Sequence, residues 1–127
     1  MIMKVSLPTL KNLLLSNVAE IKFLRRRTKP GAPSTRRMLC TNSLSLLSSP
    51  EGRIALNYRR AINYPKFNPE AKTLLITWDI FMQDYRCINM SACDLINVIP
   101  ANKSFWEFFN KQLSLLSTEQ KVRFMNS

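Results

Sequence analysis

Two short segments of alternating apolar and polar residues, joined by a dense turn signal, constrain the fold of this chain most strongly. The alternation runs over residues 18–24 and again over residues 35–41, and the run KPGAP lies between them at residues 29–33. A period of two is typical of half-buried strands, and proline next to glycine is typical of turns. These segments therefore predict a β-hairpin with a stiff, basic tip.

Further strands are expected downstream at similarly short spacing. They are residues 53–59, 74–78 and 85–90, of which the last two form a second hairpin around a turn at 81–84. In the first of them Ile54, Leu56 and Tyr58 would share one face, and residues 61–72 are expected to form a proline-containing loop. Because no crossover helix separates these strands, we expect a small antiparallel barrel.

Helical signals stand at both ends of the chain. The expected helices are 1–17 (with Ser6 as cap, Pro8 in the first turn and Asn17 as stop), a short one at 91–99 ended by Pro100, 105–116 capped by Asn102 or Ser104, and a last one that begins at the capping box of Ser117 and Gln120. Four aromatic residues between positions 105 and 109 leave the third helix apolar nearly all round. Such a helix either packs on the barrel and the N-terminal helix or forms a dimer contact.

The length of 127 residues suits one domain and is short for two. We expect a mainly β, α+β domain in which residues 1–17 are an N-terminal helix, 18–99 a small barrel and 100–127 a C-terminal helical extension. The terminal helices would cover the open edges of the barrel.

The hairpin segments also carry a family resemblance. Residues 18–25 (VAEIKFLR), a turn with Gly31 and residues 35–41 (TRRMLCT) resemble paired strands of bacteriophage-encoded small SH3-like β-barrel proteins. Residues 74–79 (LLITWD) and 84–89 (DYRCIN) are similar to the closing hairpin of that family, in which an aromatic residue precedes an arginine-containing strand.

The resemblance implies an SH3-like small antiparallel β-barrel and a viral origin, without implying an activity. The chain departs from the family in its longer, proline-rich first turn, in residues 42–72, and in the helices after residue 105.

The residues that the chain lacks exclude several kinds of catalytic site. It holds no histidine and two glycines, which excludes a Ser-His or Cys-His nucleophile, a phosphate-cradling loop and a dinucleotide fingerprint. Asp79 and Asp84 are expected to be turn residues rather than metal ligands. We therefore expect a non-enzymatic protein with no catalytic residue, no metal and no cofactor.

The cysteines and the apolar segments bear on the compartment. Cys40, Cys87 and Cys93 are odd in number and lack CxxC spacing, so we expect buried free thiols in a reducing compartment. No stretch approaches the ~18 apolar residues that span a bilayer, and residues 10–15 do not form a signal peptide. We expect a protein of the host cytoplasm, or one packaged in a virion, with no membrane partner.

The positive charge is confined to the first part of the chain. Residues 1–72 hold 14 lysines and arginines against three acidic residues, whereas residues 73–127 hold five of each. The first part therefore carries the whole formal net charge of +11. A positive charge confined to one part of the chain indicates a polyanion or an acidic protein surface as the partner.

Two basic sets are candidates for the binding site. The first set, at residues 22–37, is Lys22, Arg25, Arg26, Arg27, Lys29, Arg36 and Arg37; the second is Arg53, Arg59, Arg60 and Lys66, with Tyr58, Tyr64 and Phe67 as candidate stacking residues. Cations with interleaved aromatic rings suit single-stranded nucleic acid, because phosphates meet the cations while bases stack on the rings.

Two interpretations of these residues stay open. The arginines suit either a nucleic acid or an acidic surface of a virion or host complex, since charge gives only the sign of the partner. The aromatic residues are either stacking surfaces or parts of the core. The first interpretation predicts a viral accessory protein that binds nucleic acid, and the second a structural or regulatory adaptor within a larger assembly, of undetermined oligomeric state.

Overall fold

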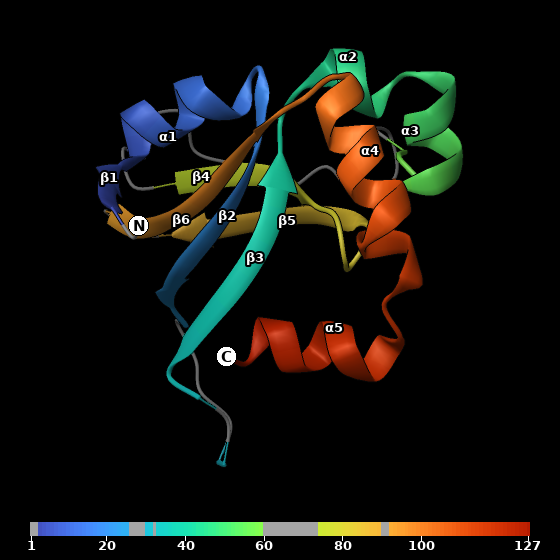
Figure 1. The fold of residues 1–127 in the computed structure, drawn as a ribbon. Coiled ribbons are helices and arrows are strands. Elements are labelled where there is room, and N and C mark those ends of the chain that lie inside the picture. The colour runs from blue at the N-terminus through green and yellow to red at the C-terminus, as the bar shows by residue number, and fades with distance from the viewer. Residues whose placement is uncertain (1–2, 26–29, 32, 60–73, 90–91) are drawn as a thin grey trace.

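The computed structural model of the 127-residue chain describes residues 3–25, 30–31, 33–59, 74–89 and 92–127 (Figure 1). Its centre is an antiparallel sheet of six strands in the order β1-β6-β2-β3-β4-β5. The strands are β1 (Met3–Ser6), β2 (Asn17–Leu24), β3 (Thr35–Thr41), β4 (Leu74–Asp79), β5 (Asp84–Asn89) and β6 (Ala92–Pro100). The expected mainly β, α+β class is thereby confirmed.

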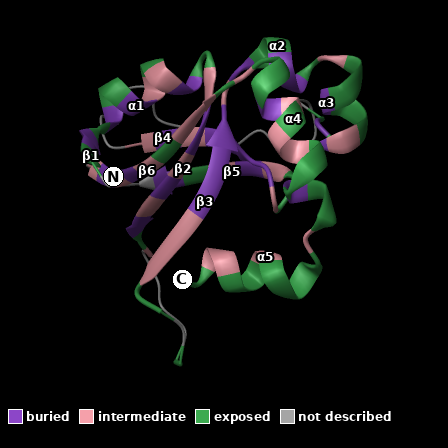
Figure 2. Cartoon of the chain, viewed as in Figure 1, coloured by how far each residue is buried: buried purple, intermediate pink, exposed green. Residues whose placement is uncertain are grey.

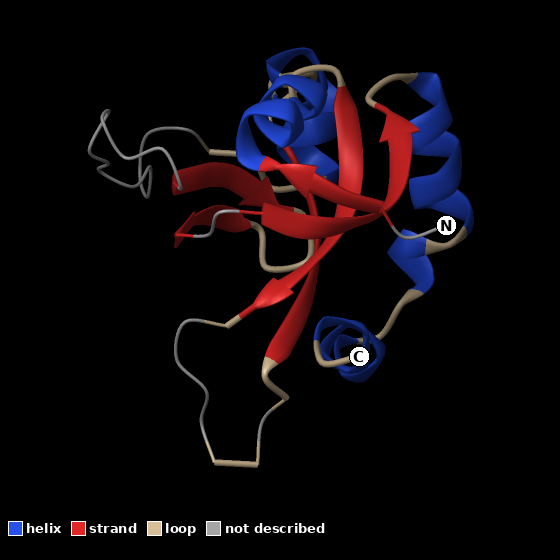
Figure 3. Ribbon diagram, turned by 90° about the vertical axis from the view of Figure 1, so that its left-hand side faces the viewer, coloured by secondary structure: helices blue, strands red, loops and turns tan. Residues whose placement is uncertain are grey.

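The sheet is open rather than closed into a barrel. β1 and β5 stand at the two ends of the strand order, and no ladder joins them within the described ranges. β3 and β4 share two residue pairs, Cys40 with Asp79 and Thr41 with Trp78. The first half of β3 consequently projects past the end of β4 (Figures 1 and 3). The closed barrel expected from the sequence is not confirmed.

Helices cover the sheet at three places. They are α1 (Leu7–Leu14), α2 (Leu44–Leu47), α3 (Pro50–Ala55), α4 (Lys103–Lys111), the 3-10 helix η1 (Leu113–Leu115) and α5 (Thr118–Met125). In Figure 1, α1 lies on one side of the sheet and α2, α3 and α4 gather on the other side, while α5 lies apart beside the lower half of β3. No described helix combines the length and the apolar character needed to cross a membrane.

Two apolar cores occupy the two faces of the sheet (Figure 2). The first core joins α1 to Ala19, Ile21, Met38 and Cys40, and the second joins Val18, Leu39, Leu46, Leu47, Leu56, Tyr58, Trp78 and Phe105. Successive residues of a strand face opposite sides, so β2 supplies Ile21 to one core and Val18 to the other. The expectation of half-buried strands is therefore too simple, because the last four residues of β3 are all buried, on alternate faces.

The two predicted hairpins and the helical caps at the C-terminal end are confirmed. β2 pairs with β3 from Val18–Thr41 to Leu24–Thr35, and β4 pairs with β5. The Asn102 side chain accepts a hydrogen bond from the Ser104 amide at 2.9 Å and caps α4. Ser117 and Gln120 form the expected capping box of α5.

The N-terminal element differs from the prediction in its first residues. α1 begins at Leu7, with Pro8 in its first turn as expected, but the Ser6 hydroxyl caps no backbone amide. Residues before it form β1, which pairs with β6 from Met3–Leu95 to Ser6–Ala92. Alternation over four residues is too short to indicate a strand without its partner, and β6 supplies that partner.

The strand predicted over residues 53–59 is wrong, because residues 53–55 end helix α3 and residues 56–59 form neither helix nor strand. The Ser49 hydroxyl accepts from the Gly52 amide at 3.0 Å and Pro50 occupies the first turn, so the local signals start a helix. A Cβ on Gly52 would lie 2.3 Å from the Leu46 carbonyl oxygen, so only glycine permits this close approach to α2. Ile54 is consequently 83% exposed rather than buried.

The short helix predicted over residues 91–99 is also wrong, since this segment is strand β6. It pairs with β1 on one side and with β2 on the other, with a register shift at Glu20 and Ile21. The burial of Cys93 and Leu95 gives it a strand period. A central strand with two partners gains a ladder along both edges, which outweighs the weak capping signal of Asp94. The strand ends at Pro100, the residue predicted to end the element.

Candidate nucleic-acid interface

Arg25, the first of the three arginines at residues 25–27, lies at the end of the β2–β3 hairpin. The Arg25 amide donates to the Ser34 carbonyl at 2.8 Å and carries the ladder one step beyond the Leu24–Thr35 pair. Beyond this point Pro30, Gly31 and Pro33 are exposed, and Gly31 adopts a φ of 82°, which favours glycine. Arg26, Arg27 and Lys29 lie outside the described residues. The part of the hairpin that leads to residues 25–27, called the stem below, is thus a hydrogen-bonded pair of strands.

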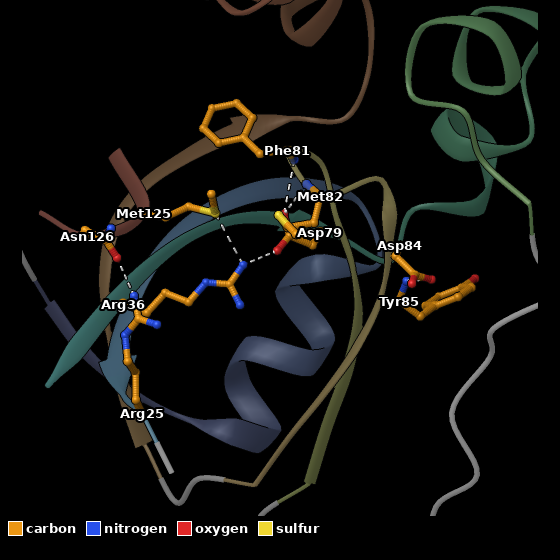
Figure 4. A network of polar contacts seen from close by, with 9 residues as sticks. All are labelled: Arg25, Arg36, Asp79, Phe81, Met82, Asp84, Tyr85, Met125 and Asn126. Atoms are coloured by element: carbon orange, nitrogen blue, oxygen red, sulfur yellow. Dashed lines mark hydrogen bonds and ion pairs between the residues drawn. The ribbon is translucent and has the colours of Figure 1, made fainter. Parts of the chain in front are cut away.

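Arg36 does not lie free for a partner, because it is part of a buried ion pair. Its Nη2 lies 2.5 Å from Oδ2 of Asp79, whose side chain is 1% exposed (Figure 4). The other oxygen of Asp79 accepts from the amides of Phe81 and Met82, each at 3.1 Å. The expectation that Asp79 is a turn residue is confirmed, and the same carboxylate neutralises Arg36. We therefore assign Arg36 to the stability of the fold.

Arg37 is also engaged within the chain. Its Nη2 donates to Oε2 of Glu20 at 2.6 Å, and its Nη1 donates to the Ser127 hydroxyl at 2.9 Å. Its guanidinium lies 5.1 Å from the ring centre of Phe124. Lys22, opposite Arg37 in the hairpin and Asp94 in β6, is half-buried. The contacts of Arg37 tie the outer part of the hairpin to the C-terminal end of α5.

Arg25 completes the contacts between the hairpin and the end of α5. Its Nη2 lies 2.5 Å from Oδ1 of Asn126, and its Nε donates to the Thr35 carbonyl at 3.4 Å (Figure 4). The Arg36 guanidinium also approaches the sulfur of Met125 at 3.6 Å. Three of the predicted binding arginines therefore contact the last three residues of the chain.

In the second basic set, the ring of Tyr58 is not accessible for stacking on a base. Its side chain is 8% exposed, its hydroxyl lies 2.5 Å from that of Tyr85, and its ring meets Trp78 edge-on at 5.0 Å. The core interpretation of Tyr58 is therefore correct, and the stacking role predicted for it is wrong. Arg53 and Arg59 are exposed; Arg60, Tyr64, Lys66 and Phe67 lie outside the described residues.

The aromatic helix α4 packs on the sheet. Phe105 is fully buried in the second core, while Trp106, Phe108 and Phe109 are half-buried around it. α1 belongs to the other core, so the predicted packing of the two helices on one another is not the main contact. The dimer interpretation stays a prediction.

An apolar cavity of about 220 Å³ lies between the sheet and the C-terminal segment. Val18, Leu39 and Ile99 line it from the strands, and Phe108, Leu113, Leu116 and Phe124 line it from the helices, with Glu20, Phe81, Asn97 and Gln112 completing the wall. Protein interiors rarely leave voids larger than a water molecule. The contact of this segment with the sheet is therefore filled only in part: Leu113 of η1 is buried in the second core, whereas no residue of α5 is buried.

The cysteines are free thiols, but one of them lies on the surface. Cys40 and Cys93 are buried as expected, whereas Cys87 in β5 is exposed, which corrects that part of the prediction. β5 is an edge strand, and Cys87 shares a face with the buried Tyr85 but lies beyond the part of that face which the second core covers. Within the described part of the chain no group of three or more potential metal ligands occurs.

Alkaline pH is expected to destabilise the fold through the two buried thiols. Burial raises the pKa of Cys93 from 9.0 to about 11, with the Asp94 carboxylate adding to the effect, and burial raises the pKa of Cys40 still further. Between pH 9 and 11 the unfolded thiols ionise while the folded ones keep their protons, so stability falls as pH rises, by about 2–3 kcal/mol for Cys93.

Urea unfolding from pH 8 to 10.5 would measure this loss. Cys40→Ala and Cys93→Ala, combined, should flatten the pH dependence, while Cys87→Ala should retain it because that thiol is exposed. An unchanged slope in the double variant would contradict the assignment.

The sequence could not show which partners hold the arginines. Arg25 and Asn126 are 101 positions apart, and Arg37 and Ser127 are 90 apart. Met125, Asn126 and Ser127 carry no motif, so the sequence did not predict their contacts with the hairpin.

Comparisons with family models, with curated proteins and with solved structures find no significant match to this chain.

Proposed function

We propose that this chain is a non-enzymatic protein that binds nucleic acid through the end of its β2–β3 hairpin. The observation that supports this most is the position of Arg25, on the last hydrogen-bonded pair that the structure describes in the stem and directly before Arg26 and Arg27 in the sequence. The segment from Lys22 to Arg37 contains seven cations and no acidic residue. Arginine forks suit phosphate oxygens, and a stiff stem holds them at low entropic cost.

The strand order supports the SH3-like part of the interpretation. β2, β3, β4 and β5 follow one another as a meander, and β6 returns to pair with β2 on its other edge. We propose that this unit is an open SH3-like small barrel of a viral accessory protein, with β1 and the helices added to it. An acidic surface of a virion or host protein is the alternative partner.

Binding is expected to weaken steeply with salt. Three phosphate contacts give a slope of log affinity against log salt of roughly −2 to −3, which lowers the affinity about 20-fold to 60-fold between 50 and 200 mM salt. The measurement is fluorescence anisotropy with labelled single-stranded DNA, single-stranded RNA and duplex DNA. Affinity that stays flat over this range would overturn the proposal.

Charge reversal locates the contact. Arg25→Glu, Arg26→Glu and Arg27→Glu together should abolish binding without loss of circular dichroism. The matched control reverses Lys4, Lys103 and Lys111, which are exposed and belong to β1 and α4 rather than to the hairpin, and changes the net charge equally. Should both triple variants lose the same affinity, the hairpin is not the site. Binding to an acidic protein that excess oligonucleotide leaves intact would favour the adaptor instead.

A further inference from the structure

α5 is fastened to the sheet chiefly by residues of the candidate interface. Its C-terminal end contacts Arg25, Arg36 and Arg37 through Asn126, Met125 and Ser127 respectively. Arg37 also lies over the Phe124 ring. These contacts gather at the end of β3 that projects past β4 (Figures 1 and 4).

The rest of α5 is weakly held. No residue of Thr118–Met125 is buried, and Val122 is 44% exposed. Phe124 meets the Phe81 ring edge-on at 5.1 Å, and the ammonium of Lys121 lies 5.9 Å from the same ring. Beneath this layer lies the cavity of about 220 Å³, so apolar packing contributes little to holding the helix.

The oxygens that the C-terminal end of α5 offers to Arg25 and Arg37 carry no charge. Asn126 Oδ1 and the Ser127 hydroxyl are neutral acceptors, at Nη2 of Arg25 and at Nη1 of Arg37. The other end of the Arg37 guanidinium, Nη2, stays bound to the Glu20 carboxylate. A phosphate oxygen forms charge-assisted and therefore stronger hydrogen bonds with the same donors. A nucleic acid and the end of α5 are thus competitors for these donors.

We propose that α5 is a displaceable cover of the nucleic-acid site, and that binding of the phosphate backbone to Arg25 and Arg37 releases it from β3. This inference rests on the proposed function. Arg36 stays paired with Asp79 in both states because that ion pair is buried. The coupling is reciprocal: whatever weakens the docking of α5 raises the affinity for nucleic acid.

Release of α5 has a direct signature. The helix is eight residues long, and isolated helices shorter than about 12–15 residues are marginal in water, so a released α5 should melt. Hydrogen exchange followed by mass spectrometry, with and without a saturating 20-nucleotide single strand, is expected to show at least about tenfold faster exchange in residues 118–127. Slower exchange is expected around the hairpin.

Variants of α5 should move the affinity in both directions. Phe124→Ala removes the ring contacts with Phe81 and Arg37 and is expected to raise the affinity about threefold to tenfold, whereas Val122→Ala, its control, should not. Asn126→Asp with Ser127→Asp places carboxylates at the same arginines and should lower it. The control for added charge is Asn110→Asp with Ser114→Asp, on exposed positions before α5.

The outcomes separate the two proposals. If oligonucleotide binds to the hairpin but exchange in α5 is unchanged or slower, the cover is refuted and the proposed function stands. Equal affinities of Phe124→Ala and the unmodified chain would refute the cover as well. If no oligonucleotide binds at low salt, both proposals are overturned.

Discussion

Asp79→Ala is expected to lower the free energy of unfolding by about 3–5 kcal/mol, because it leaves a buried cation without its partner. The Asp79 carboxylate is 1% exposed and neutralises Arg36, whose own side chain is 15% exposed. Its second oxygen satisfies the amides of Phe81 and Met82 in the turn between β4 and β5. The substitution therefore removes one salt bridge and two hydrogen bonds to backbone amides of the turn.

Urea denaturation measures this loss, and Asp94→Ala is its matched control. Asp94 is 40% exposed and lies 3.9 Å from Lys4 on the surface, so its loss should cost no more than about 1 kcal/mol. Adding Arg36→Met to Asp79→Ala removes the uncompensated charge and should restore part of the stability. If Asp79→Ala and Asp94→Ala unfold alike, the buried pair does not form.

The sequence predicted best those elements whose signals are local and repeated. β2 and β3 show alternation over seven residues or more with a turn between them, and the capping box of α5 needs residues three apart. Each of these signals agrees with the final packing, so the local preference and the tertiary structure support one another.

The two wrong secondary-structure predictions concern short segments whose sequence is compatible with both a helix and a strand. Residues 53–59 alternate as a strand would, but Ser49 and Pro50 start a helix immediately before them. Residues 91–99 show a possible cap, but two neighbouring strands supply ladders on both edges. In residues 91–99 the deciding contacts come from distant strands, whereas in residues 53–59 the deciding signal is the cap immediately before the segment; a period alone shows neither.

The candidate site was predictable in its charge and not in its contacts. The cluster of cations at residues 22–37 is visible in the sequence, but a guanidinium bound to phosphate and one bound to a buried carboxylate look alike there. Arg36 meets Asp79 across 43 positions, and Tyr58 meets Tyr85 across 27. Only the fold separates Arg36, which is paired with a buried carboxylate, from Arg25, whose side-chain acceptor is the neutral amide of Asn126.

Phe105→Ala is the second substitution with a large expected effect. Phe105 is fully buried in the second core, with Trp106 at 5.1 Å and Phe109 at 5.9 Å between ring centres. Truncation of a buried phenylalanine leaves a cavity that the surrounding helix and strands fill only in part. We expect the free energy of unfolding to fall by about 3–5 kcal/mol.

Trp106→Ala provides the comparison, because its ring is larger but half-buried. The sequence alone placed both rings on one apolar helix, whereas the structure assigns the central position to Phe105. Trp106→Ala should therefore cost less than Phe105→Ala, although tryptophan has the greater apolar area. Urea unfolding of the two variants tests this order. The reverse order would mean that the Trp106 ring is the one enclosed, which a dimer contact through α4 would produce, and sedimentation of the unmodified chain would then show the dimer.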